Sequence, residues 1–146
     1  MKQKTMMLSK NFTLEELTYS ATAARKGIDN TPSEKEINAL KRLCANVLQP
    51  IREEYGLPIV ITSGYRCKTL NSLVGGAVSS QHRYGEAADM KVGNRTQNKA
   101  LFDLIVKMIK AGKITVGQLI NEYNYSWIHV SLPRLGKPNN QILSIG

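Results

Sequence analysis

Only two histidines occur in this chain of 146 residues, and the residues around them limit how the chain can fold. His82 lies in a short polar segment, Asp89 follows it closely, and His129 lies far along the chain. Two imidazoles and one carboxylate form a typical catalytic zinc site, which leaves a fourth position for water. If the three side chains share one ion, the fold must bring a loop and two strands together.

The length and composition fit one soluble globular domain. Hydrophobic residues make up 42% of the chain and charged residues 21%, which excludes disordered and fibrous classes. No stretch is long and apolar enough for a membrane span, and no internal repeat is found. We expect an extension over residues 1–10, followed by a single domain over residues 11–146 that acts as a monomer.

The chain carries a net charge of +9, from twenty Lys and Arg against eleven Asp and Glu. This charge favours contact with polyanions such as nucleic acids, anionic lipids or anionic cell-wall polymers. The basic residues are scattered, without zinc-finger or basic-zipper spacing, so no specific nucleic-acid partner is expected. A solvated basic surface without a partner is the alternative.

Three segments carry helix signals. A capping box that begins at Thr13 predicts a short first helix. Thr31 and Pro32 suit the cap and first turn of a long helix, which Pro50 ends or kinks. A further helix is predicted over residues 96–111, where apolar side chains recur at helical spacing.

Four segments carry strand signals. Residues 58–62 form a β-branched run typical of a buried strand, and residues 87–92 alternate between polar and apolar side chains. Residues 118–123 and 127–132 are two strand-like runs with a short polar turn between them, which predicts a hairpin. We therefore predict an α+β fold, in which helices pack on a small, mainly antiparallel sheet.

The residues around His82 belong to a longer set of motifs. The set comprises Ser80-x-His82-x-x-Gly85-x-Ala87-x-Asp89, Ser63-Gly64-Tyr65-Arg66 and Trp127-Ile128-His129-Val130-Ser131. With these motifs the chain resembles the zinc D-alanyl-D-alanine carboxypeptidase-like peptidases, from about Phe12 to Leu132. The resemblance implies their fold, which Hedgehog domains share, and makes His82, Asp89 and His129 the ligands of a zinc ion.

The same resemblance implies roles for polar residues near the ligands. Arg66 matches the arginine that holds a substrate carboxylate, a task that suits a planar guanidinium; a strand-end ion pair is the alternative. Ser80 and Gln81 are expected to bind substrate or to orient a ligand, with ordinary loop hydrogen bonds as the alternative.

The general base is the point at which the sequence departs from this family pattern. The position three residues before the last histidine, where better-known members have glutamate, is Ser126. We expect Glu122 to replace it, because a hairpin would return its carboxylate to the metal; an ordinary surface glutamate is the alternative. The competing carboxylates are Glu53, Glu54 and Glu86.

The resemblance implies a zinc metallopeptidase, a hydrolase that cuts a peptide bond in the stem peptides of bacterial peptidoglycan. Both a D-Ala-D-Ala carboxypeptidase and an endolysin-type endopeptidase fit this expectation. A noncatalytic zinc-containing module that binds cell wall or protein is the first alternative, because Hedgehog domains resemble the same site. Nucleic-acid binding is a second alternative, which depends on the charge alone.

The N-terminal segment begins with basic residues, but its apolar run stops after Leu8, which is too short for a signal peptide. We therefore expect synthesis in the cytoplasm. Action on the cell wall would then follow release by another protein, as in a phage or prophage lysis system.

Overall fold

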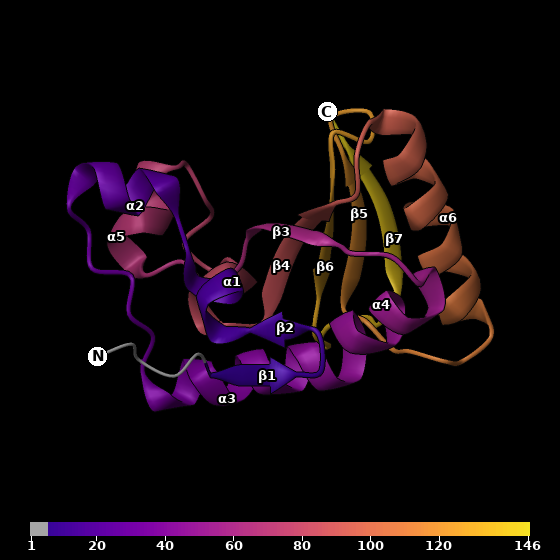
Figure 1. The fold of residues 1–146 in the computed structure, drawn as a ribbon, viewed down its shortest axis with the longest axis horizontal. Helices are drawn as coiled ribbons and strands as arrows, with labels where there is room; N and C mark the ends of the chain where they lie inside the picture. Colours follow the sequence, from indigo (N-terminus) through magenta and orange to yellow (C-terminus); the bar gives the residue numbers. More distant parts are fainter. Residues whose placement is uncertain (1–5) are drawn as a thin grey trace.

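The structure is a computed structural model that describes residues 6–146, and its centre is a five-stranded sheet (Figure 1). The strands lie in the order β3-β4-β6-β5-β7. Their bounds are β3 (Val60–Ser63), β4 (Ala87–Lys91), β5 (Gln118–Glu122), β6 (Trp127–Ser131) and β7 (Gln141–Ile145). The predicted hairpin is confirmed as β5 and β6, which pair antiparallel.

The sheet is mixed, so the prediction of a mainly antiparallel sheet needs correction. Strand β7 pairs parallel with β5, whereas β3, β4, β6 and β5 pair antiparallel with one another. No strand was predicted for β7, because the sequence Gln-Ile-Leu-Ser-Ile does not alternate. The strand predicted near residue 60 is present, but the prediction that it is buried is wrong, because β3 is a half-exposed edge strand.

The remaining elements surround this sheet. A small hairpin joins β1 (Met7–Ser9) to β2 (Phe12–Thr13). The α-helices are α1 (Leu14–Thr18), α2 (Ala21–Lys26), α3 (Glu34–Leu43), α4 (Gln49–Tyr55), α5 (Lys68–Leu73) and α6 (Arg95–Lys110). A π-helical segment, η1 (Cys44–Leu48), links α3 to α4, and a short 3₁₀ helix, η2 (Gln81–Tyr84), precedes β4. Helices α2 and α5 lie at one end of the molecule and α6 at the other (Figure 1).

Local signals determine where the helices begin. The capping box of α1 is confirmed, since Thr13 and Glu16 bond each other's backbone N–H groups. The long helix begins later than predicted, because Ser33 and Glu36 form its capping box. Thr31 instead donates its backbone N–H to Asp29, in a turn before the helix.

Pro50 does not end the long helix. The helix passes from α3 through η1 into α4, and it ends at Gly56 in a left-handed conformation. Proline lacks the N–H that an α-helix would bond four residues back. The wider π-helical turn of η1 immediately before Pro50 accommodates this missing bond.

The two faces of the sheet have different roles, because successive side chains on a strand point to opposite faces. Ala88, Met90, Leu119, Ile128 and Val130 join the hydrophobic core. This core also contains side chains of α3, η1, α4 and α6. The opposite face therefore carries the alternate residues of β4, β5 and β6, among them Asp89, Glu122 and His129.

Asn98 of α6 ties three segments behind the site. It is 1% exposed; its carbonyl accepts the N–H of Val92, and its amide donates to the carbonyls of Tyr125 and Ser126. Asn98→Ala removes these bonds and leaves buried groups unpaired, so we expect a loss of about 2–4 kcal/mol in the free energy of unfolding. Urea denaturation measures this loss. The exposed Asn46→Ala is the control, and equal midpoints for the two variants would contradict the role.

Within residues 6–146, no helix combines the length and the apolar character needed to cross a membrane. The predicted boundary between an extension and a domain at residue 11 stays a prediction. Strand β1 lies before that boundary, and Leu8 contributes to the core.

Candidate metal centre

His82 is held at the site by the short helix η2. The Ser80 hydroxyl accepts the His82 backbone N–H at 3.2 Å, which caps the start of η2. The ring Nδ1 lies 2.7 Å from the carbonyl oxygen of Gly64, and the ring is 3% exposed. If Nδ1 carries the proton and donates to Gly64, Nε2 keeps its lone pair for a metal.

Gly64 has to be small to support this histidine. An added Cβ would lie 2.2 Å from the carbonyl oxygen of Leu17, which leaves no room for a side chain. The neighbouring Tyr65 N–H donates to the same carbonyl at 2.7 Å. The segment after β3 is therefore fixed against α1, and it holds the carbonyl that orients His82.

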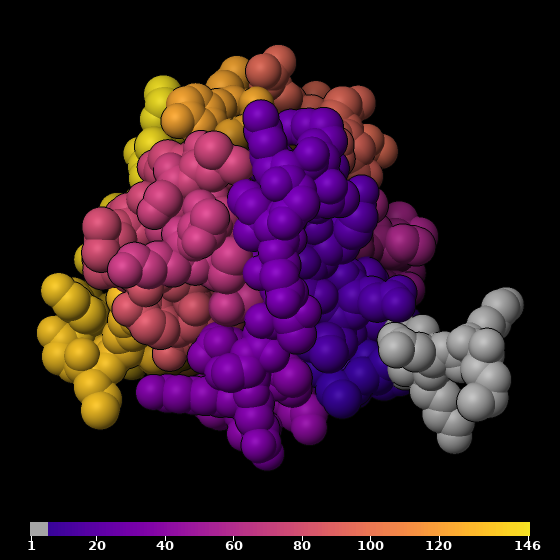
Figure 2. Space-filling view, turned by 90° about the vertical axis from the view of Figure 1, so that its left-hand side faces the viewer, coloured from indigo at the N-terminus to yellow at the C-terminus, as the bar shows by residue number. Residues whose placement is uncertain are grey.

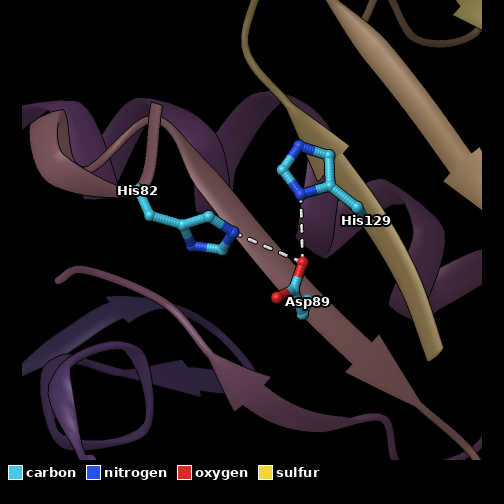
Figure 3. A group of neighbouring side chains, drawn as sticks. All are labelled: His82, Asp89 and His129. Atoms are coloured by element: carbon cyan, nitrogen blue, oxygen red, sulfur yellow. Dashed lines mark hydrogen bonds and ion pairs between the residues drawn. The ribbon is translucent and has the colours of Figure 1, made fainter. Parts of the chain in front are cut away.

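Asp89 and His129 meet because β4 and β6 pair in one register. The two residues are direct cross-strand partners, and their side chains share the face opposite the core. The Asp89 carboxylate oxygen Oδ1 lies 3.0 Å from His129 Nδ1 and 3.3 Å from His82 Nε2 (Figure 3). One carboxylate oxygen thus lies between the two imidazoles.

The three side chains fit a metal ion. Each offers a ligand atom, and these atoms all lie within 4.8 Å of one another. Burial raises the pKa of the Asp89 carboxyl, but hydrogen bonds from His129 and His82 outweigh it and lower the pKa below its usual range. Asp89 is therefore a carboxylate at neutral pH, and the buried anion favours a cation between it and the imidazoles.

Glu122 lies beside this cluster, at the end of β5. Its Oε2 is 4.0 Å from His129 Nδ1, the ring atom that faces Asp89. Burial and the charge of Asp89 raise its pKa, while His129 and Trp127 act in the opposite direction. Trp127 is the cross-strand partner of Glu122, and its indole N–H is buried beside the carboxylate.

The turn after Glu122 has an unusual backbone. Tyr123, Asn124 and Tyr125 all have positive φ, at 52°, 54° and 61°, which costs energy for residues other than glycine. The Asn121 side chain accepts the Tyr125 N–H at 2.6 Å and so supports the turn. The hairpin was predicted from the sequence, but the left-handed backbone of its turn was not, because no glycine marks it. It closes the hairpin that makes Glu122 and Trp127 partners.

Arg66 approaches the site from the segment after β3. Its backbone N–H donates to the carbonyl of His82 at 3.0 Å, and its buried Nε has no hydrogen-bond partner among residues 6–146. Burial lowers the pKa of the guanidinium, while the charges of Asp89 and Glu122 partly restore it. The structure thus fixes Arg66 against the His82 segment and leaves its side chain partly exposed.

Other predicted residues face elsewhere. The Gln81 amide donates to the carbonyl of Leu132 at 2.8 Å, so its side chain is turned toward the segment after β6. Two competitors for the base are engaged away from the cluster: Glu54 pairs with Lys113 at 2.7 Å and Glu86 with Arg134 at 3.1 Å. The third competitor, Glu53, is exposed on α4.

Comparison with known proteins agrees with this geometry. Residues 10–131 match the family described as Peptidase M15, which covers most of the chain and includes His82, Asp89, Glu122 and His129. The chain belongs to the peptidase M15 family. A zinc D-Ala-D-Ala carboxypeptidase of Streptomyces albus G is 47% identical over 49 residues. That match spans 33% of this chain and 19% of the relative.

Family membership confirms the prediction of a peptidase. The match spans about a fifth of the length of the Streptomyces protein, so the substrate of that protein is a proposal for this chain. The individual roles of His82, Asp89, His129, Glu122 and Arg66 stay predictions. Their support is the geometry described above.

Proposed function

We propose that the protein hydrolyses a peptide bond in bacterial peptidoglycan stem peptides, with His82, Asp89 and His129 as the zinc ligands. The observation that carries this proposal is the position of Glu122, whose carboxylate lies beside the three ligand side chains. A peptidase needs a base at this place, whereas a binding module does not. The relative from Streptomyces albus G supports a wall peptide as substrate.

The residues of the chain divide the work of hydrolysis. Zinc, when bound, polarises the scissile carbonyl and makes water more acidic. Glu122 accepts the proton of the attacking water and then delivers it to the leaving amine. The partial burial of Glu122 raises its pKa, which makes its protonated form easier to reach between these two steps. Asp89 stays ionised throughout.

Arg66 binds a substrate carboxylate in this proposal. Its side chain is partly exposed, so the guanidinium can donate to a carboxylate on the substrate. The nearby Asp89 and Glu122 keep the guanidinium charged despite its burial. A terminal carboxylate, as in a peptide that ends in D-Ala-D-Ala, would therefore be held next to the ligands.

Arg66→Lys should raise KM for a peptide with a free C-terminal carboxylate by roughly tenfold to a hundredfold, because lysine cannot form the paired hydrogen bonds of a guanidinium. Steady-state kinetics on acetyl-Lys-D-Ala-D-Ala measure the change. The same peptide with a C-terminal amide is the control substrate, and Arg95→Lys on α6 is the control variant. An equal loss on both peptides would mean that Arg66 has only a structural role.

Digestion of purified peptidoglycan tests the substrate class. The zinc-loaded protein is incubated with wall material, and mass spectrometry assigns the released fragments. We expect cleavage within stem peptides, which would be lost on chelation and restored by zinc. Fragments cut only in the glycan strands, or no fragments at all, would overturn the proposal.

The type of cleavage and its setting are the finer parts of this proposal. Loss of a terminal D-alanine would identify a carboxypeptidase, and internal cuts would identify an endopeptidase of the endolysin type. We propose that the protein reaches the wall after release, in a phage or prophage context. Attraction of the basic protein to anionic wall polymers would assist it. Co-expression with a membrane-permeabilising protein, followed by a lysis assay, tests this setting.

A further inference from the structure

The register of the sheet arranges the side chains of the metal face in rows that cross the strands. The row of the metal ligands contains Asp89, His129, Ile120 and Leu143. A second row, two residues further along each strand, contains Ala87, Ser131, Gln118 and Gln141. Successive residues rise by about 3.4 Å, so the second row lies about 7 Å from the first. Glu122 lies on the opposite side of the ligand row.

A cavity opens over this second row. Its volume is about 360 Å³, which is within the range of small-ligand sites. Gln118 and Gln141 contribute side-chain amides to its lining, and Gln81 contributes a third. Arg134 and Lys137 supply two cations. Among the described residues that line it there is no carboxylate, so the charge of the lining is positive. The amide nitrogens of Gln81 and Gln118 already donate to the Leu132 carbonyl and to Gln141 Oε1.

The two cations differ in whether their charge is already paired with a carboxylate of the protein. Arg134 is already engaged, since its Nε contacts the Glu86 carboxylate at 3.1 Å and its Nη1 donates to the carbonyl of Ser79. Its guanidinium also lies 5.4 Å from the centre of the Tyr84 ring. Within the part of the chain that the structure describes, Lys137 forms no ion pair. The net positive charge of the cavity therefore comes from Lys137.

The segment that carries Lys137 is anchored at both ends. Residues 133–139 protrude from the body of the protein, where the gold segment is seen in Figure 2. Arg134 fixes the beginning of this segment. At its end, the Asn140 N–H donates to the Val116 carbonyl, and the Asn140 side chain accepts the Val116 N–H. Lys137 is thus presented over the cavity by a supported loop.

We propose that this cavity is a substrate subsite that binds a carboxylate on the acyl side of the scissile bond, with Lys137 as its specificity-determining residue. The acyl side is the consistent choice, because Arg66 is assigned to the carboxylate beyond the scissile bond. Gln141 lies two strands across from His129, about 10 Å, and about 7 Å along the strands, which places it about 12 Å from the ligand row. Two residues of an extended peptide cover about 7 Å of this distance and a glutamate side chain covers the rest, so the carboxylate belongs to the second residue before the cut. The inference rests on the proposed peptidase function and names its preferred substrate.

Three synthetic peptides test the subsite: acetyl-Glu-D-Ala-D-Ala and its counterparts with Gln or Lys in the first position. The zinc-loaded protein should prefer the Glu peptide over the Gln peptide by roughly fivefold to twentyfold in kcat/KM, because the subsite adds a charge-assisted hydrogen bond. Lys137→Gln should reduce this preference to within about twofold, and Lys137→Glu should turn it toward the Lys peptide. Lys107→Gln, on the exposed side of α6, should leave it unchanged.

A binding measurement separates this inference from the proposed function. Calorimetry on zinc-loaded Glu122→Gln gives the Kd of each peptide without turnover. We expect the Glu peptide to bind more tightly than the Gln peptide, as in the kinetic measurement. If all three peptides are hydrolysed and bound equally, the subsite assignment is wrong while the peptidase proposal stands. If none is bound or hydrolysed, the proposed function is contradicted and the subsite falls with it.

Discussion

Asp89→Asn is expected to weaken zinc binding by at least about a hundredfold and to abolish peptide hydrolysis. Its carboxylate oxygen lies between His82 and His129, at 3.3 Å and 3.0 Å from their facing nitrogens. The neutral amide of asparagine removes the negative charge that would balance the zinc ion at this buried site. Competition with a chromogenic chelator measures the affinity, and kcat/KM on a stem peptide measures the activity.

The thermal stability of the same variant gives an independent test. Zinc that binds only the folded protein stabilises it by about 4 kcal/mol at a thousand times its Kd, so zinc should raise the Tm of the unsubstituted protein. Asp89→Asn should lose most of this increase. Asp103→Asn, which affects only an exposed pair with Lys99 on α6, is the matched control. Undiminished zinc stabilisation in Asp89→Asn would mean that the ion binds elsewhere.

Glu122→Gln is expected to keep zinc and to lower kcat by roughly a hundredfold to ten-thousandfold, the usual contribution of a general base. The amide is nearly isosteric with the carboxylate but cannot accept the proton of the attacking water. Glu122 lies 4.0 Å from His129 but is not one of the three proposed zinc ligands, so the zinc affinity should change little. Metal analysis and steady-state kinetics on one preparation measure both quantities.

Glu54→Gln is the matched control, because Glu54 is a glutamate in an ion pair with Lys113 outside the cluster. It should retain full activity. Unchanged hydrolysis in Glu122→Gln would assign the base to another group. If neither the unsubstituted protein nor Glu122→Gln cleaves peptidoglycan while both bind it, the noncatalytic binding module becomes the better account.

Much of the fold was predictable because its signals are local. The capping box at Thr13 determines the start of α1, and the helical spacing of apolar residues predicts α6. Strand β7 was missed because it is a short, exposed edge strand whose partner β5 lies in a distant segment. Its parallel pairing depends on the route of residues 132–140, which carry no regular pattern.

The candidate site was predictable in its residues but not in its geometry. The motif around His82 and Asp89 supported the resemblance, and the two histidines limited the choice of ligands. The register that makes Asp89 and His129 partners follows from long-range strand pairing, which no local pattern encodes. Position 126 lacks the expected glutamate; the predicted hairpin indicated Glu122 instead, and the structure adds the distance of 4.0 Å from its carboxylate to His129 Nδ1.

X-ray absorption at the zinc edge tests the central claim most directly, because it reports the atoms bound to the ion. If His82, Asp89 and His129 hold zinc, the loaded protein should contain one zinc per chain with only nitrogen and oxygen neighbours, at about 2.0–2.2 Å. Cys67 is a partly accessible free cysteine near Arg66, so a wrong site would have a thiolate within reach. A sulfur neighbour at about 2.3 Å would contradict the three-ligand centre.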